Sequence, residues 1–410
     1  MSHRAATVTA HVRIGEEDAQ LTDPSKLLAA LGDAIGTRSA SARSTAALLS
    51  NPGCERRAVL DAARVDLAVL AERLGAPAQF GQSPFAIGQG NRFEERIKSE
   101  DYAALIEAIN EVLGIFDGVT ELRSVNLERV GKLRGRKLIV ARAEATAEVL
   151  SSIARGDADA PHVIDHGVTT LDVGGNTVYL EQDALAFRDG EHLRICEVKG
   201  FPIIDGTASP AKVGGAARQT AVYVASIQDT LVAQGFDPGL VSAEVLLICP
   251  KNFSIGPVAV LVDVDREVRS LRRQLRRRSV VGDIIQRVER DSKAEGVKVK
   301  NLVADAQEAK PGSKKSRKSA AALVNQLPFR YQPECLSSCD LARHCRTCSQ
   351  KADDPGWLGG DVAGLLGGVG SISDAIALAD GSAPSAEQAE VAALLRNAQI
   401  AIEDATGSTP

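Results

Sequence analysis

The sequence predicts an α/β protein with a helical first part, a core of apolar strands and a cysteine-rich segment near its end. Apolar residues at helical spacing, from Tyr102 through Ile109 to Leu113, predict an amphipathic helix. After Pro161 the pattern changes to short apolar runs rich in β-branched residues, which is typical of strands. With 410 residues, the chain has room for one large domain with extensions or for two domains.

The elements are expected in the following order. Helices are predicted at 44–49, 55–74, from Asn91, at 102–113 and through most of 120–150, with a loop at 75–90. Strands are predicted at 163–171, 177–187 and 193–201, with Asp189–Gly190 as a hairpin signal. Then come a helix at 216–233, strands at 243–249 and 258–264, a basic helix at 265–291, a glycine-rich loop at 357–370 and a terminal amphipathic helix at 386–404.

Composition excludes several classes of protein. The net charge is only -5, so a nucleic-acid surface would have to come from local clustering of basic residues. No apolar run approaches the roughly 20 residues that span a bilayer. Residues 1–17 lack the apolar core of a signal peptide, so we expect a cytoplasmic protein without membrane contact. Seven cysteines, four of them crowded near the C-terminus, favour metal ligation in a reducing compartment over disulfides.

Charged residues inside two apolar strands predict a metal-dependent site. Asp183 lies in one expected strand, and Glu197 and Lys199 lie in the next and share a face because strand side chains alternate. Buried charges are costly unless they are paired or bound to metal. We expect Asp183, Glu197 and the Val198 carbonyl to hold Mg²⁺ or Mn²⁺, with Lys199 orienting a water molecule or stabilising charge on a phosphate.

Three further residues are candidates for the same site. Gln219 and Tyr223 are four residues apart on the following helix, so they share a face and can support Lys199 or contact a bound strand. Glu94, from its own helix, can add a carboxylate to the metal shell. A two-residue turn at Asp189–Gly190 would put Asp183 and Glu197 on opposite faces, so we expect an odd-length loop or a bulge between them.

The order of these residues resembles that of the RecB-like branch of the PD-(D/E)xK nucleases. The resemblance implies a restriction-endonuclease-like mixed central sheet flanked by helices, and Mg²⁺- or Mn²⁺-dependent cleavage of DNA. As in that family, Gln219-x-x-x-Tyr223 follows the Glu197-x-Lys199 strand. The family has Gly two residues before the motif aspartate, where this chain has Glu181.

Four cysteines near the C-terminus, Cys335, Cys339, Cys345 and Cys348, form a second constellation. By themselves they suit either tetrahedral zinc or an iron-sulfur cluster, and so short a span favours zinc. With Cys54, however, the pattern resembles the CRISPR-associated RecB-like exonucleases and the AddB nuclease subunit. That resemblance implies a 4Fe-4S cluster held by Cys54, Cys335, Cys339 and Cys345, with Cys348 as a spare or substitute ligand. The Cys335-x3-Cys339 spacing is one residue longer than in those families.

A dense basic face is expected in the helix that follows the last core strand. Arg272, Arg273, Arg276 and Arg277 are the candidate DNA-binding residues, and a solvated helix paired with Glu267 and Glu289 is the alternative. The chain has no Gly-x-x-x-x-Gly-Lys-Ser/Thr loop and therefore no P-loop motor of its own.

These observations predict six regions: an extension (1–43), a helical region with Cys54 and Glu94 (44–160), a nuclease core (161–300), a basic flexible linker (301–325), an iron-sulfur segment (326–350) and a Gly-rich tail with a terminal helix (351–410). The predicted function is an exonuclease or nickase on single-stranded or frayed DNA, in genome defence or in recombination and repair. A helicase, integrase or other ATPase is the expected partner. The alternative is a catalytically silent, zinc-stapled DNA-binding subunit or scaffold.

Overall fold

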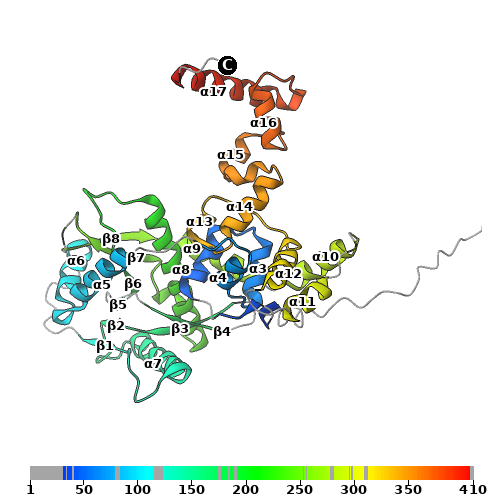
Figure 1. Ribbon diagram of the computed structural model, residues 1–410. Coiled ribbons are helices and arrows are strands. Elements are labelled where there is room, and N and C mark those ends of the chain that lie inside the picture. Colours follow the sequence, from blue (N-terminus) through cyan, green and yellow to red (C-terminus); the bar gives the residue numbers. More distant parts are fainter. Residues whose placement is uncertain are drawn as a thin grey trace, which may run out of the picture.

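A six-stranded sheet forms the centre of the computed structural model. The structure describes residues 31–33, 35–38, 41–78, 84–114, 123–173, 177–182, 185–188, 192–252, 254, 256–277, 281–294, 296, 299–308 and 313–406. In spatial order the strands are β1 (Ser124–Asn126), β2 (Val163–Asp165), β5 (Leu185–Arg188), β6 (Leu193–Val198), β7 (Glu244–Pro250) and β8 (Pro257–Asp263). β1 runs parallel to β2 and β6 runs parallel to β7, whereas the other neighbours are antiparallel. The sheet is mixed and helices surround it (Figure 1), so the predicted α/β class is confirmed.

Two of the expected strands are broken, because the chain changes sheets within them. The expected strand 163–171 is divided into β2 and β3 (Val168–Asp172), and 177–187 is divided into β4 (Thr177–Glu181) and β5. β3 and β4 pair with each other in a separate antiparallel hairpin. At the first break, His166 has a left-handed φ of 56°, which turns the chain out of the main sheet. Apolar runs lie on both sides of Asp165-His166-Gly167 and of Glu181-Gln182-Asp183, and so short a polar interval does not show that the chain changes sheets.

Helices cover both faces of the sheet. On one face, α5 (Pro84–Lys98), the short turn η1 (Glu100–Tyr102) and α6 (Ala103–Leu113) pack against Cys196 of β6. On the other face, α7 (Gly135–Arg155), α8 (Pro210–Ala233) and α9 (Asp265–Arg277) pack in the cluster that contains Ile195. The turn η2 (Pro238–Leu240) then leads from α8 to β7. Because β6 is buried from both sides, a charged residue within it lies in the interior.

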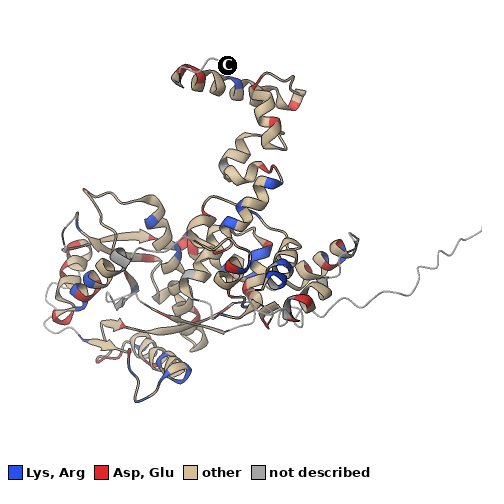
Figure 2. Cartoon of the chain, in the orientation of Figure 1, with Lys and Arg blue, Asp and Glu red and all other residues tan. Residues whose placement is uncertain are grey.

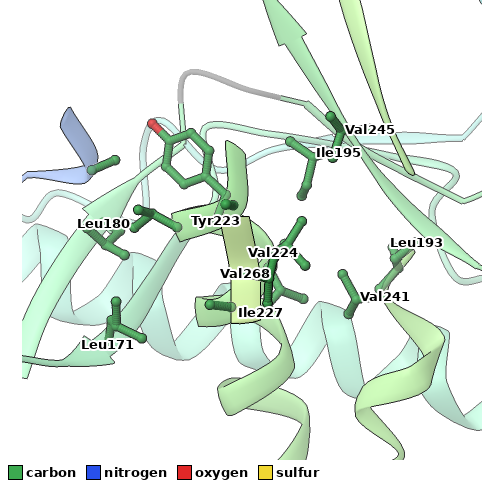
Figure 3. Close-up of a cluster of buried hydrophobic side chains, with 14 of the residues drawn as sticks. Leu171, Leu180, Leu193, Ile195, Tyr223, Val224, Ile227, Val241, Val245 and Val268 are labelled. Atoms are coloured by element: carbon green, nitrogen blue, oxygen red, sulfur yellow. The ribbon is translucent and has the colours of Figure 1, made fainter. Parts of the chain in front are cut away.

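The core beneath α8 holds one aromatic ring with a polar end. Figure 3 shows Val224 and Ile227 of α8 near Ile195, with Tyr223 beside Leu180. Tyr223 is only 1% exposed, and its hydroxyl oxygen points away from these aliphatic side chains in the same view. A buried tyrosine hydroxyl needs a hydrogen-bond partner, so polar groups must lie close to Tyr223 at this end of the core.

A second core is helical, and residues 31–71 meet residues 281–345 in it. The helices α3 (Glu55–Ala62), α4 (Leu67–Arg73), α10 (Val281–Ala294), α12 (Lys314–Asn325), α13 (Cys335–Ser338) and α14 (Ala342–Lys351) contribute to it. Cys335 and Cys345 belong to this cluster. The helix α2 (Ala42–Ser50) contacts both α8 and α13, and so connects the two cores. The expected region 44–160 is thus divided between the helical core and the sheet.

Three segments expected as linker, loop or one long helix have a different structure. The segment 301–325 contains most of α11 (Val299–Glu308) and all of α12, whose Leu323 and Val324 are buried, so a flexible tether is wrong for these helices. The helical stretch 265–291 is divided between α9 and α10. The glycine-rich segment contains part of η4 (Pro355–Leu358) and α15 (Gly360–Leu365). Packing against the helical core explains α12, because its apolar end covers that core.

The C-terminal helices form an arm that extends away from the rest of the protein (Figure 1). After α15 come α16 (Ile372–Ala379), η5 (Ala386–Gln388) and α17 (Ala389–Thr406), which confirms the terminal helix. A small core of its own holds the arm together; its buried residues are Leu366, Val369, Ala375, Leu378 and Ala392. Among the described residues, no helix is both long and apolar enough to cross a membrane.

Candidate functional site

Glu197 and Lys199 lie at the end of β6, on the face that α8 covers. Glu197 is 1% exposed and forms an ion pair with Lys199, whose side chain is 25% exposed. The backbone N–H of Lys199 donates to the Ile248 carbonyl at 2.9 Å and continues the pairing of β6 with β7. A buried carboxylate is therefore held beside a half-buried ammonium group at an edge that solvent reaches.

Helix α8 supplies the groups that hold Lys199. The Lys199 ammonium donates to Gln219 Oε1 at 3.1 Å, and Gln219 Nε2 donates to the Tyr223 hydroxyl at 3.2 Å. The Tyr223 hydroxyl donates in turn to the Glu181 carbonyl at 3.2 Å. We call Glu197, Lys199, Gln219 and Tyr223 the polar chain. The structure brings these four predicted residues together, and Gln219 supports Lys199 as its helical spacing predicted.

Arg142 extends this arrangement and was not found from the sequence. Its guanidinium is buried and donates to Glu181 Oε1 at 2.8 Å and to the His166 carbonyl at 2.5 Å. The Glu181 side chain thus turns towards α7, while its carbonyl accepts from Tyr223. Glu181 and Arg142 together fix the end of β4, two residues before Asp183 in the sequence. An arginine in a long amphipathic helix gives no signal that its partner lies 39 residues away.

Asp183 itself lies outside the described residues, as do Asp189 and Gly190. The ladder between β5 and β6 pairs Leu185 with Cys196 and Arg188 with Leu193. Four residues, an even number, therefore lie between the paired ends, and the described ladder is regular. The expected odd-length loop is therefore wrong, whereas a bulge between Asp183 and Leu185, which would bring Asp183 to the face of Glu197, falls outside the described residues.

Glu94 does not join the polar chain. Its carboxylate pairs with Lys98 at 2.9 Å, and Lys98 also contacts Asp165 at 2.9 Å. Asp165 is 1% exposed and accepts from the Tyr102 hydroxyl at 3.1 Å. Burial works to lower the pKa of Lys98, but its hydrogen bonds to Glu94 and Asp165 outweigh burial and raise it. Lys98 is thus held as a cation between two carboxylates under α5, on the sheet face opposite Glu197.

The cysteine group consists of Cys54, Cys335, Cys339 and Cys345, which the structure brings together. Burial raises the pKa of Cys335 and of Cys339, and the negative charges of neighbouring cysteines, Cys54 among them, raise both further. Burial likewise raises the pKa of Cys345 to about 12, with added contributions from Cys339 and Cys54. Each of the three C-terminal thiols is thus close enough to Cys54 for their charges to interact.

The segment around Cys54 also supplies donors to the other sulfur atoms. Asn51 Nδ2 donates to Cys335 Sγ at 3.2 Å, and Arg56 Nη1 donates to Cys345 Sγ at 3.2 Å. Arg57 forms a hydrogen bond with Cys339 that lowers the pKa of this thiol against the larger effect of burial. Both arginines are buried. Buried cations and N–H donors at three sulfurs stabilise thiolates, and the sequence interpretation missed all three residues.

Cys348 lies apart from this group. Its Sγ lies 3.6 Å from His344 Nε2 and 3.8 Å from Asn325 Oδ1, on the side towards α12. Burial lowers the pKa of His344 to about 4, so its ring is neutral at pH 7. The expected cysteine set is therefore found without Cys348, although this residue remains within one helical turn of Cys345.

The arginines of α9 do not form one free basic face. Arg272 donates to Asp229 at 2.7 Å and to Gln228 at 3.0 Å, and so ties α9 to α8. Arg272 is thus already engaged within the protein, and DNA binding by these arginines stays a prediction. Arg273 and Arg276 are exposed, whereas the side chain of Arg277 is outside the described part.

Neither site is preassembled around a single ion. Within the described residues, no set of three or more His, Cys, Asp or Glu side chains is arranged so that it can hold one metal ion. Four thiolates around one zinc ion at about 2.3 Å would lie within about 4 Å of each other. Comparison with known proteins gives no further assignment, since no protein-family model, curated protein or solved structure matches this chain.

Proposed function

We propose that this protein is a metal-dependent nuclease of the RecB-like PD-(D/E)xK type, with a restriction-endonuclease-like core that acts on DNA. The observation that carries the proposal is the polar chain. A buried glutamate and a lysine two residues apart on one strand are held by a glutamine and a tyrosine from the next helix. Burying the charges of Glu197 and Lys199 costs free energy, and the packing of the apolar core does not require charged residues at these positions.

The donor set at the end of β6 fits a hard divalent cation. Asp183, Glu197 and the Val198 carbonyl would hold Mg²⁺ or Mn²⁺, since carboxylate and carbonyl oxygens suit these ions. When bound, the ion would lower the pKa of a coordinated water molecule and polarise a phosphate oxygen. A carboxylate that is 1% exposed is favoured in its charged form only beside cations, and here Lys199 already provides one.

The other side chains of the polar chain have positioning roles. Lys199 offers its ammonium to the attacking water or to charge on the phosphate, and Gln219 fixes the direction of that ammonium. Tyr223 links Gln219 to the Glu181 carbonyl. The Glu181 side chain is held towards α7 by Arg142, so the acid that replaces the family's glycine is turned aside. This supports an active site over a silent one.

The cysteine group fits an iron-sulfur cluster. Cys54, Cys335, Cys339 and Cys345 would each bind a different iron of a 4Fe-4S cluster, around which their sulfurs would lie farther apart than around one zinc ion. Asn51, Arg56 and Arg57 would stabilise the negative charge of the group. Because Cys54 and Cys335 come from opposite ends of the chain, the cluster would hold the helical core closed. DNA would be the substrate, and a helicase or other ATPase would supply unwinding in the cytoplasm.

The test is digestion of 5′- and 3′-labelled single-stranded DNA in Mn²⁺ by the wild type, Glu197→Ala and Asp183→Ala. Glu244→Ala is the control, since Glu244 lies on the neighbouring strand β7 and its side chain is 57% exposed. We expect cleavage by the wild type and the control only. Equal cleavage by all four proteins would refute the proposed site. Iron content and visible absorption after anaerobic purification test the cluster, and a colourless protein loaded with zinc would refute it.

A further inference from the structure

The loop that leads into α7 carries an uninterrupted run of exposed cations. We call residues 129–137, which comprise this loop and the first three residues of α7, the basic loop; its cations are Arg129, Lys132, Arg134, Arg136 and Lys137. No acidic residue occurs between Glu128 and Glu144. All five side chains are exposed, and none forms an ion pair with any other residue that the structure describes. Figure 2 shows this blue loop below α7.

The start of α7 strengthens the positive potential of the basic loop. This helix has 21 residues, no acidic residue in its first turn and no side chain that caps its first N–H groups. Its N-terminal dipole is therefore not neutralised by the protein itself, and free N–H groups point towards the loop. Gly131 and Gly135, with φ of 60° and 57°, provide the left-handed turns that bend the chain here.

Helix α7 connects the basic loop to the polar chain. Arg142, seven residues into the helix, holds Glu181, whose carbonyl accepts from Tyr223. Seven residues of α-helix span about 10 Å. That length corresponds to about three phosphates along one strand of a duplex. A polynucleotide that runs from Lys199 to the basic loop would cover this length after it has passed the links from Lys199 to Arg142 through Gln219, Tyr223 and Glu181.

The basic loop differs from α9, the other arginine-rich part of the protein. Arg269 pairs with Asp265, and Arg272 is used by α8. In α10, Arg287 likewise pairs with Glu55. These guanidinium groups are already partly neutralised, so the basic loop offers more unpaired positive charge per residue. An anion is attracted most strongly where unpaired positive charge is densest, and this favours the basic loop over α9 although α9 has more arginines.

The acidic balance of the whole chain does not oppose such binding. Residues 353–410 contain nine acidic residues and one arginine. Residues 1–352 contain 47 basic and 44 acidic residues and are therefore slightly basic, with a net charge of +3. The net charge of -5 thus comes from the C-terminal arm, which extends away from the basic loop in Figure 1.

We infer that the basic loop and the first turn of α7 bind the sugar-phosphate backbone of the polynucleotide that the polar chain cleaves. This inference rests on the proposed function and names the surface that holds its substrate. Residues 123–142 contain no aromatic side chain, so the contacts are electrostatic and without base stacking. Binding through this surface is therefore independent of base sequence and falls steeply with salt.

The test uses the full-length protein without divalent cations, so that DNA is bound and not cut. Fluorescence anisotropy of a labelled oligothymidylate of about 30 nucleotides is measured at several salt concentrations. The loop variant carries Lys132→Gln, Arg136→Gln and Lys137→Gln. The control variant carries Lys314→Gln, Lys315→Gln and Lys318→Gln, which remove the same charge from exposed positions in α12. Thermal unfolding confirms that both variants are folded.

The loop variant should bind at least about tenfold more weakly at about 0.1 M salt, and its slope of log K against log salt should fall by about 2. The control variant should keep the wild-type slope. Wild-type binding by the loop variant, or an equal loss in the control, overturns the inference. So does a loop variant that loses binding only to phosphatidylserine vesicles, because the loop would then be a membrane surface.

The same proteins separate this inference from the proposed function. Loop-dependent binding by a chain that never cleaves DNA would leave the surface in place and refute the nuclease. Cleavage that depends on Glu197, with unchanged binding and cleavage by the loop variant, would refute the surface and leave the nuclease.

Discussion

The polar chain and the cysteine group are both assembled from separate segments, but different forces hold them. The polar chain rests on β6 and α8, whose apolar residues pack in one core, and each link in it is a hydrogen bond or an ion pair. The cysteine group joins segments as far apart as Asn51 and Cys335, separated by 284 positions, and its buried thiols raise each other's pKa. The first is therefore arranged by the protein itself, whereas under the proposed function the second would be complete only with a bound iron-sulfur cluster.

This difference predicts that single substitutions in the two regions affect different properties of the protein, stability in the cysteine group and activity in the polar chain. A change in the cysteine group should reduce stability first, because the bound group holds the two ends of the chain together. A change in the polar chain should reduce activity with little loss of stability, because the surrounding core remains packed.

The largest effect is expected from Cys345→Ser. Loss of one ligand should remove the bound group and lower the stability of the helical core by several kcal/mol, on the order of a structural metal site. Iron content and thermal unfolding are the measurements. Cys348→Ser is the control, since Cys348 contacts His344 and Asn325 instead of the cysteine group. Equal loss of iron from both variants would contradict the assignment of ligands.

Lys199→Met should come next, with its main effect on the rate of cleavage. Removing an ammonium that stabilises charge in the transition state costs about 10²- to 10³-fold in kcat. The melting temperature should fall less than in Cys345→Ser: methionine keeps the length of the side chain, but the buried Glu197 carboxylate loses its cation. Lys251→Met, at an exposed position after β7, is the control. A wild-type rate for Lys199→Met would remove this residue from the mechanism.

Gly200→Ala tests how closely α5 must approach the end of β6. A methyl group at Gly200 would lie 3.0 Å from the Cα of Gly90 in α5, so one backbone must move. We expect a loss of about 1–3 kcal/mol in unfolding free energy, the usual cost of overpacking, together with lower activity because Lys199 is adjacent. Gly215→Ala, where a methyl group meets nothing within 4 Å, should be tolerated. Equal behaviour of the two variants would mean that the contact of α5 does not position Lys199.

Glu181→Gln should have a smaller effect. The Glu181 side chain is 53% exposed, so its ion pair with Arg142 contributes less than about 1 kcal/mol to stability. The carbonyl that Tyr223 uses is unchanged, and we expect only a few-fold loss of cleavage rate. Denaturant unfolding and initial rates measure both. A loss as large as that of Lys199→Met would show that the carboxylate itself takes part in the reaction.

The smallest effect concerns two thiols outside both regions. Burial raises the pKa of Cys196 and raises that of Cys249 to about 12. At pH 8 the Cys249 thiolate is then only about one part in 10⁴, so iodoacetamide should not modify it in the folded protein. Alkylation rises with pH, because a raised pKa leaves the thiol protonated until the pH approaches it. Mass spectrometry of the native protein checks this, and rapid labelling of Cys249 at pH 8 would contradict its burial in the sheet.

The parts of the fold and of the candidate site that depend on local geometry could be predicted from the sequence. The spacing of Gln219 and Tyr223 fixes them on one face of a helix, and the alternation in β6 puts Glu197 with Lys199. The breaks at His166 and Gln182 could not be predicted, since they depend on which sheet each segment joins. The same is true of Arg142 and Arg56, whose partners lie far away in the sequence. In α12, the lysines at the start predicted a flexible linker, but the apolar residues at its end pack in the helical core and stabilise a helix.

The most direct test of the central claim measures rate and stability on one sample of Glu197→Gln, which keeps the shape of the side chain and removes its charge. The account predicts that Mn²⁺-dependent cleavage of single-stranded DNA falls at least about 10³-fold while the melting temperature is unchanged or higher, because a buried charge has been removed. Cleavage at the wild-type rate, or a loss of cleavage only in proportion to unfolding, would contradict it.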